Sequence, residues 1–213
     1  MHANFITTFR VFLSFIVVIL LVQGTPASFW TAFILTAIVL WFDGLDGFIA
    51  RKFNEASKFG AMLDIMCDRI VECVYWISFS GLGWIPMWIP LVVVVRGLTT
   101  DGLRSLAMEQ GYTAFGSSTM MQSELGKFIV TSDFCRFTYA VTKAFAFAFL
   151  ILANFPGGAI TGTSKIAYTC AYIAVIFCVV RGIPVIIESK RFIEPMMAQK
   201  MTPVKKSDEE ENP

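Results

Sequence analysis

The feature that most constrains this chain is a succession of long apolar runs that carry almost no charge. The first, at residues 11–22, reads VFLSFIVVILLV and has Ser14 as its only polar side chain. Together with residues 5–10 it is long enough to cross a bilayer as a helix, which takes roughly 20 mostly apolar residues. No A-x-A cleavage site follows the run. We therefore interpret it as an uncleaved membrane span rather than as a signal peptide.

Further apolar runs follow at residues 29–42, 65–84, 87–103, 137–153 and 166–187. Their length and continuity are typical of helices, because the strands of a membrane barrel are shorter and alternate apolar with polar residues. The composition agrees, since 56% of the 213 residues are hydrophobic and only 15% are charged. Soluble proteins carry about a quarter charged residues. We expect an all-α, polytopic membrane protein with a bundle of about six transmembrane helices.

Basic residues are concentrated in alternate connections of this arrangement. The connections at 51–58 and 104–136, together with the segment 188–213, hold most of the lysines and arginines outside the runs, whereas the opposite connections hold only Lys165. By the positive-inside rule, both termini are predicted to lie in the cytoplasm.

The domain organisation is simple. We predict one membrane domain over residues 1–198 and a disordered, charged cytoplasmic tail over 199–213, because the final stretch KKSDEEENP is highly charged and lacks apolar residues. The net charge of +1 and the absence of a basic stripe argue against nucleic-acid binding. The five cysteines form no CxxC pair, so they predict neither a zinc site nor a disulfide framework.

Four aspartates border apolar runs, where a carboxylate is costly unless it has a partner or a function. Asp43 and Asp46 are three residues apart, and Asp64 and Asp68 are four apart. In a helix, each spacing places the two carboxylates on one face. One interpretation is that each acid pairs with a nearby base, such as Arg51 or Arg69. The other is that two facing helices bring all four acids together.

Four clustered carboxylates remain ionised together only if cations lie among them. Oxygen ligands without a nearby histidine or cysteine favour Mg²⁺ or Mn²⁺ over Zn²⁺. We therefore predict a divalent-metal site, with room for two ions. Gly44, Gly47 and Gly60 lie near the acids and leave space for a ligand to approach.

The segment from Asp43 to Asp68 resembles the CDP-alcohol phosphotransferase family. It reads DGLDGFIARKFNEASKFGAMLDIMCD and fits the pattern D-x2-D-G-x2-A-R-x8-G-x3-D-x3-D without a gap. A motif of this length is far more specific than a short glycine pattern.

The resemblance implies a membrane enzyme of six spanning helices, commonly a homodimer, that displaces CMP from a CDP-linked lipid with the hydroxyl of a second alcohol. It implies that Asp43, Asp46, Asp64 and Asp68 bind the metal ions and that Asp68 is also the general base. It further implies a CDP-lipid site, which we expect to comprise Thr8, Gly47, Ala50, Arg51 and Gly60. The substrates would be CDP-diacylglycerol and a small alcohol phosphate, and the active site would open to the cytoplasm.

Two other segments resemble the phosphatidylglycerophosphate synthases, a branch of this family. They are NFITTFR at residues 4–10 and RGLTTDGLRSLAMEQG at 96–111, the latter followed by LGK at 125–127. The acceptor implied is glycerol 3-phosphate. Its phosphate would need fixed cations, for which arginine and lysine are suited. The candidates are Arg96, Arg104 and Lys127, with an ion pair to Asp101 or Glu72 as the alternative for Arg96.

The sequence after Gly126 and Lys127 departs from the usual pattern of these synthases, which continue with Lys-Thr and a glutamine. Inositol phosphate, serine and phosphatidylglycerol therefore stay open as acceptors. Arg136 and Lys143 are candidates to supply the missing charge or to bind such a different alcohol phosphate. Lys143 and Arg181 lie inside apolar runs, so each is either functional or paired. A different class, a divalent-cation channel or carrier, could also use intramembrane aspartates. It would have no use for Gly60 and Arg51 at these spacings.

Overall fold

The computed structural model describes residues 2–52, 58–109, 121–158 and 162–198, with the backbone only at 2–3, 43–52, 58, 61, 192 and 195–198. In these ranges the regular elements are all helices: α1 (His2–Gln23), α2 (Pro26–Lys52), α3 (Lys58–Gly81), α4 (Trp88–Glu109), α5 (Glu124–Thr131), α6 (Asp133–Ala153) and α7 (Thr163–Ala198). The prediction of an all-α protein is confirmed. The tail at 199–213 lies outside the described residues, and the predicted domain boundary stays a prediction.

The six long helices coincide with the six apolar runs of the sequence. Three segments are long and apolar enough to cross a membrane: Asn4–Gln23, Asp133–Ala153 and Thr163–Arg191. A shorter apolar segment covers Pro26–Phe42. Helices α3 and α4 carry several charged residues within their apolar sequence. Membrane association follows from the three apolar helices, and the count of six spans stays a prediction.

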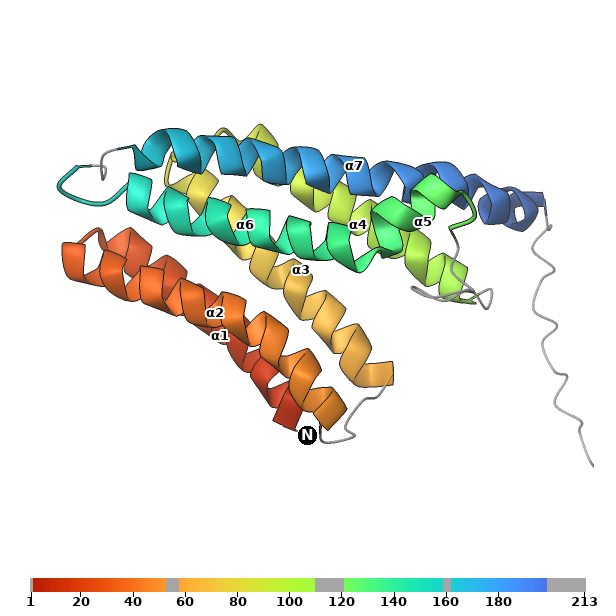
Figure 1. Ribbon diagram of the computed structural model, residues 1–213, viewed down its shortest axis with the longest axis horizontal. Coiled ribbons are helices and arrows are strands. Elements are labelled where there is room, and N and C mark those ends of the chain that lie inside the picture. The colour runs from red at the N-terminus through yellow and green to blue at the C-terminus, as the bar shows by residue number, and fades with distance from the viewer. Residues whose placement is uncertain (1, 53–57, 110–120, 159–161, 199–213) are drawn as a thin grey trace, which may run out of the picture.

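The long helices pack side by side as a bundle (Figure 1). Helix α1 packs against α2 and α3, and α4 packs between α3 and α7. Helix α6 lies along α7 and also contacts α2. The short α5 packs against both α6 and α7. It lies at one end of this helix pair, opposite the end where α6 and α7 are connected (Figure 1).

Aromatic rings fill the bundle between α3 and α6. The ring of Phe147 stacks on Tyr75 at 4.7 Å between centroids and meets the edge of Trp76 at 5.1 Å. Phe79 completes the cluster, and all four side chains are at most 1% exposed. The Tyr75 hydroxyl donates to Thr36 on α2 at 3.0 Å, which satisfies the one polar atom that this ring carries. The cluster therefore holds three helices together without an unpaired tyrosine hydroxyl.

The outer surface of the bundle is strongly apolar. Phe12, Val95 and Ile176 are each more than 60% exposed, and similar side chains are exposed along every long helix. Soluble monomers rarely expose apolar surface on this scale, so the outer surface is suited to lipid rather than to water.

Candidate functional site

The four aspartates lie on two helices of unbroken backbone. Helix α2 continues past the apolar run to Lys52, so the backbone is helical at Asp43 and Asp46, as their spacing predicts. The side chains at 43–51, which include Gly47, Ala50 and Arg51, lie outside the described residues. Gly60, Asp64 and Asp68 lie at successive turns of α3. Asp64 and Asp68 thus share one face of α3, which confirms this part of the prediction.

A buried arginine on α1 joins the two described aspartates. The Nη2 atom of Arg10 is 2.5 Å from Oδ1 of Asp68 and 3.5 Å from Oδ1 of Asp64. The Arg10 side chain is 1% exposed, whereas the two aspartate side chains are 44% and 46% exposed. The guanidinium therefore approaches from inside the bundle, and both carboxylates also face an accessible space. Neither acid pairs with Arg69, which the sequence had allowed.

These two carboxylates fit part of a divalent-metal site. They supply hard oxygen ligands on one helix face, and they are accessible enough for an ion to reach them. Among the described side chains, no cluster of three or more acids, histidines or cysteines completes a site. Asp43 and Asp46, the other predicted ligands, are not among those side chains. The four-acid cluster therefore stays a prediction.

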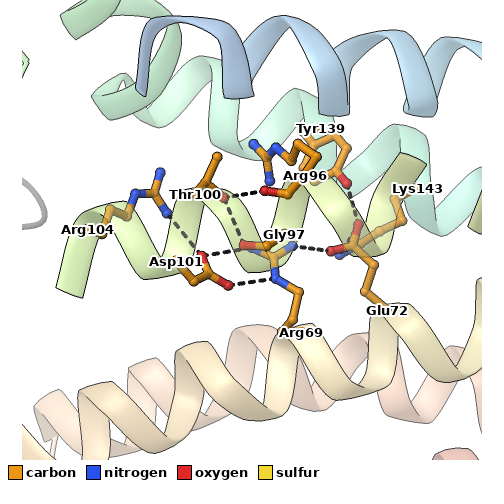
Figure 2. A network of polar contacts seen from close by, with 9 residues as sticks. All are labelled: Arg69, Glu72, Arg96, Gly97, Thr100, Asp101, Arg104, Tyr139 and Lys143. Carbon is orange, nitrogen blue, oxygen red and sulfur yellow. Dashed lines mark hydrogen bonds and ion pairs between the residues drawn. The ribbon is translucent and has the colours of Figure 1, made fainter. Parts of the chain in front are cut away.

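A second polar cluster lies deeper in the bundle and joins α3, α4 and α6 (Figure 2). Arg69 of α3 forms two hydrogen bonds to Asp101 of α4, from Nε to Oδ2 at 2.9 Å and from Nη2 to Oδ1 at 3.2 Å. Its Nη1 atom also donates to Oε2 of Glu72 at 2.8 Å. One guanidinium thus binds two carboxylates on two helices, which suits its fork of donors.

Glu72 is the most buried acid of this cluster, with its side chain 3% exposed. The Tyr139 hydroxyl donates to its Oε1 atom, and the Lys143 ammonium lies 3.8 Å from the same oxygen. A buried carboxylate needs such partners, because an unpaired charge in the bundle would be strongly destabilising. Lys143, which the sequence marked as functional or paired, is therefore paired with Glu72.

Three further arginines lie beside this cluster, and one of them, Arg104, also pairs with Asp101 at 3.8 Å. Two acids, Glu72 and Asp101, face two close cations, Arg69 and Lys143. Arg96, Arg104 and Arg181 lie within electrostatic range of one another and repel. An excess of positive charge therefore remains between α4 and α7, which favours the binding of an anion.

Arg96 and Arg181 have particularly few acceptors. The Nε atoms of both are buried without a hydrogen-bond partner in the described part of the chain. Arg181 donates only to the Val130 carbonyl, at 3.3 Å, and stacks over the Tyr139 ring at 5.5 Å. The predicted pairing of Arg96 with Asp101 or Glu72 is not found, because Arg69 binds both acids. Buried donors of this kind are an ordinary feature of a site for an anionic ligand.

Lys127, the third predicted acceptor ligand, lies on α5. Its ammonium is 3.8 Å from Glu124 at the surface, and in the described ranges no contact joins it to Arg96 or Arg104. The N-terminus of α5 is held by Glu188 of α7, whose Oε2 accepts from the Gln122 amide at 2.5 Å. The structure therefore brings Arg96 and Arg104 together and leaves Lys127 apart from them.

A cleft of about 280 Å³ is lined by residues of both polar sites. Its walls include Arg10 and Asp68 of the first site, Glu72 and Lys143 of the deeper cluster, and apolar side chains such as Val39 of α2 and Phe137 of α6. The cleft therefore combines charged groups with apolar walls that would suit a substrate having both characters.

Thr8 and Gly60, the described members of the predicted CDP-lipid site, lie on α1 and α3. The Thr8 hydroxyl donates to the Asn4 carbonyl at 2.9 Å and is exposed. Sequence reasoning assigned no role to Arg10 and considered Arg69 only as an ion-pair partner of the four aspartates. The available signal was a charged residue within or next to an apolar run, but the partners lie 54 and 32 residues away, and spacing along one helix does not reveal them.

The chain resembles known proteins over most of its length. A family model described as CDP-alcohol phosphatidyltransferase matches residues 1–197. A CDP-diacylglycerol–glycerol-3-phosphate 3-phosphatidyltransferase of Wigglesworthia glossinidia brevipalpis is 35% identical over 117 residues, which cover 50% of this chain and 59% of the relative. A protein of the same description from Mycoplasma pneumoniae is 28% identical over 127 residues, covering 50% and 55%.

A putative cardiolipin synthase of Mycobacterium bovis is 35% identical over 72 residues, covering 34% of each chain. The matched region thus spans little more than half the length of the first two relatives.

Proposed function

The chain belongs to the CDP-alcohol phosphatidyltransferase family, and from this premise we propose that it transfers a phosphatidyl group from CDP-diacylglycerol to glycerol 3-phosphate. The products would be CMP and phosphatidylglycerophosphate. The observation that carries the proposal is the pair Asp64 and Asp68, two accessible carboxylates on one helix face, of which Asp68 lines a cleft together with Glu72 and Lys143. The relatives named for this reaction support the choice of acceptor.

The metal requirement is proposed on the same acids. Asp64 and Asp68, with Asp43 and Asp46 on α2, would hold one or two Mg²⁺ or Mn²⁺ ions. Bound there, the metal would neutralise the diphosphate and stabilise charge on the attacking and leaving oxygens. Gly47, Ala50, Arg51, Gly60 and Thr8 would surround the CDP portion of the lipid.

Asp68 is the general base in this proposal. A hydroxyl oxygen of glycerol 3-phosphate forms a new bond to the phosphorus that carries the diacylglycerol oxygen, and its proton passes to the Asp68 carboxylate. The bond from that phosphorus to the bridging oxygen of the diphosphate breaks, and CMP leaves with the electron pair. Arg10 donates a hydrogen bond to the Asp68 carboxylate and would fix its orientation.

The acceptor phosphate would bind the arginines between α4 and α7. Arg96 and Arg104 supply guanidinium groups for bidentate contacts, and Arg181 adds a third cation beside them. Lys127 would contribute a longer-range positive charge from α5. A dianion is the natural ligand of such a cluster, because it relieves the repulsion among the arginines and supplies acceptors for the buried Nε atoms of Arg96 and Arg181.

The membrane arrangement is proposed as multi-pass, with both termini and the site opening in the cytoplasm. The acyl chains of the lipid would then stay in the bilayer, while the nucleotide and the acceptor exchange with the cytosol. We also propose a homodimer, which the family resemblance implies.

The decisive experiment is an acceptor panel on the purified full-length protein. CMP release from CDP-diacylglycerol is measured with Mg²⁺ or Mn²⁺ and with glycerol 3-phosphate, inositol phosphate, serine or phosphatidylglycerol. We expect release with glycerol 3-phosphate and loss of activity with a chelator. Release with phosphatidylglycerol alone would instead identify a cardiolipin synthase. No release with any acceptor, together with metal flux in vesicles, would favour the carrier.

Asp68→Asn tests the assignment of the base. We expect turnover to fall by at least about a hundredfold while CDP-diacylglycerol binding changes little, because an amide cannot take the hydroxyl proton. Asp133→Asn is the matched control, since this aspartate is 92% exposed at the start of α6. Equal activity of the two variants would contradict the assignment.

A further inference from the structure

Asp101 lies between two arginines that it does not contact equally. Its two oxygens are 2.9 and 3.2 Å from the Nε and Nη2 atoms of Arg69 on α3. The closest contact to Arg104, one turn along α4, is 3.8 Å from the Nη1 atom. Figure 2 shows Asp101 directed toward Arg69, with Arg104 on its other side. Arg69 is therefore the dominant partner of this carboxylate.

The contact depends on a glycine that lets α3 and α4 approach. A Cβ atom at Gly97 would lie 2.9 Å from Cδ and 3.0 Å from Nε of Arg69. These distances are too short for carbon against carbon or nitrogen, so a side chain at 97 would displace the Arg69 side chain. The absence of a side chain at this position thus allows Arg69 to lie across α4 and reach Asp101.

We propose that Arg69 is a positioning residue that keeps the ion pair between Asp101 and Arg104 long, at 3.8 Å, and thereby sets the affinity for the acceptor phosphate. This inference rests on the proposed function, in which Arg104 binds that phosphate. Arg69 itself touches no substrate in this scheme and acts only through Asp101.

The physical reason is competition between two anions for one guanidinium. Asp101 is only 29% exposed, so its charge needs a cation close by. Without Arg69, the nearest alternative is Arg104, which shares its helix face at a spacing of three residues. A shorter Asp101–Arg104 pair would then neutralise more of the charge that the acceptor phosphate requires, and phosphate binding would weaken.

Two variants test this idea. Arg69→Met should raise both the KM for glycerol 3-phosphate and its dissociation constant by about tenfold, within the range measured for close charge pairs. Adding Asp101→Asn should bring both values back to within about threefold of wild type, because the competing carboxylate is gone. The KM for CDP-diacylglycerol should change by less than about twofold in either variant.

The double variant distinguishes this positioning role from a purely structural one. If Arg69 served only to tie α3 to α4, removing Asp101 as well would leave the acceptor constants of Arg69→Met unchanged or make them worse. Such a result, or an unchanged KM and dissociation constant in Arg69→Met, would overturn the proposal.

A glycine variant provides the same test with all the charges kept. Gly97→Ala should displace Arg69 and raise the same two constants, and Asp101→Asn should again restore them. Gly102→Ala is the matched control on α4, because a Cβ atom there meets nothing within 4 Å. If Arg69→Met fails to fold, the comparison of Gly97→Ala with Gly102→Ala tests the proposal instead. Equal values of the KM and of the dissociation constant for glycerol 3-phosphate in these two variants would contradict it.

The dissociation constant of glycerol 3-phosphate is measured by calorimetry on the full chain, without turnover. If wild-type protein binds this acceptor but releases no CMP, the proposed reaction fails, and the predicted shifts in binding still test the role of Arg69. If wild-type protein neither binds nor uses it, both proposals fail. If wild-type protein is active and the constants do not shift, only the role of Arg69 fails.

Discussion

Arg10 is the residue that most directly links the first helix to the chemistry proposed here. Its guanidinium is buried, whereas the carboxylates that it contacts are nearly half exposed. The arginine is therefore fixed by the bundle, and Asp68 is fixed by the arginine. A carboxylate oriented in this way suits a general base, because it must keep one orientation while its accessible side faces the substrate.

We expect Arg10→Met to lower kcat by at least about tenfold, because Asp68 loses the group that orients it. Arg10→Lys should recover part of the loss, since it keeps the charge but not the fork of donors. Water can hydrate the half-exposed acids after the substitution, so the melting temperature should fall by only about 3 °C. Steady-state kinetics and thermal unfolding check these values. A large loss of stability with unchanged kcat in the folded fraction would contradict this role.

At the scale of elements, the position of α5 is fixed by a carboxylate from another helix. Glu188 of α7 accepts from the amides of Gln122 and Ser123 and from the Ser123 hydroxyl. Ser123 is the N-cap of α5 and accepts from the Gly126 amide at 3.0 Å. An anion at a helix N-terminus is also favoured by the helix dipole. The segment that carries Lys127 is thereby attached to α7.

This attachment predicts the outcome of a double-mutant cycle. Glu188→Ala removes the acceptors, and Gly126→Ala introduces a Cβ atom 2.5 Å from Oε1 of Glu188. Each change should lower the melting temperature by about 3 °C, since the loss of roughly 1 kcal/mol lowers it by 2–4 °C in a chain of this size. The losses in the double variant should be less than additive, because the added methyl group no longer meets the glutamate, although its contact with Oγ of Ser123, at 2.6 Å, remains. Strictly additive losses in thermal unfolding would contradict this contact.

The positions of the elements were predictable from the sequence, and their polar contacts were not. Six apolar runs correspond to six long helices because the burial of backbone groups in lipid leaves helices as the simplest solution. The helical spacing of Asp64 and Asp68 follows from the same periodicity. The short α5 was missed because it lies within the expected connection 104–136 and lacks a long apolar run. The choice of Arg69 rather than Arg96 by Asp101 depends on the approach of α3 to α4 at Gly97, which no local pattern reports.

At the scale of the whole molecule, the outer surface and the charge distribution define how the protein lies in a membrane. The exposed apolar side chains surround the bundle, whereas the ionised clusters lie inside it or near the helix ends. Together with the lysines and arginines of alternate connections, this arrangement predicts cytoplasmic termini.

Protease treatment of oriented vesicles checks the orientation. A peptide tag after Pro213 should be cleaved in inside-out vesicles and protected in right-side-out vesicles. A tag in the connection 154–165, which holds only Lys165, should show the opposite pattern. Cleavage of both tags from the same side would contradict the predicted topology.

The neighbouring residues Arg96 and Gly97 restrict how α4 can be altered. Gly97 leaves space for the Arg69 side chain from α3. Arg96 lies against Gly182 of α7, where an added Cβ atom would be 2.9 Å from Cγ of Arg96. Adjacent residues point about 100° apart around a helix, so one α4 register serves both contacts. A single-residue insertion between Trp88 and Val95 would rotate both positions away from their partners at once. New specificities in this scaffold should therefore arise by side-chain replacement, and length changes should be confined to the loops.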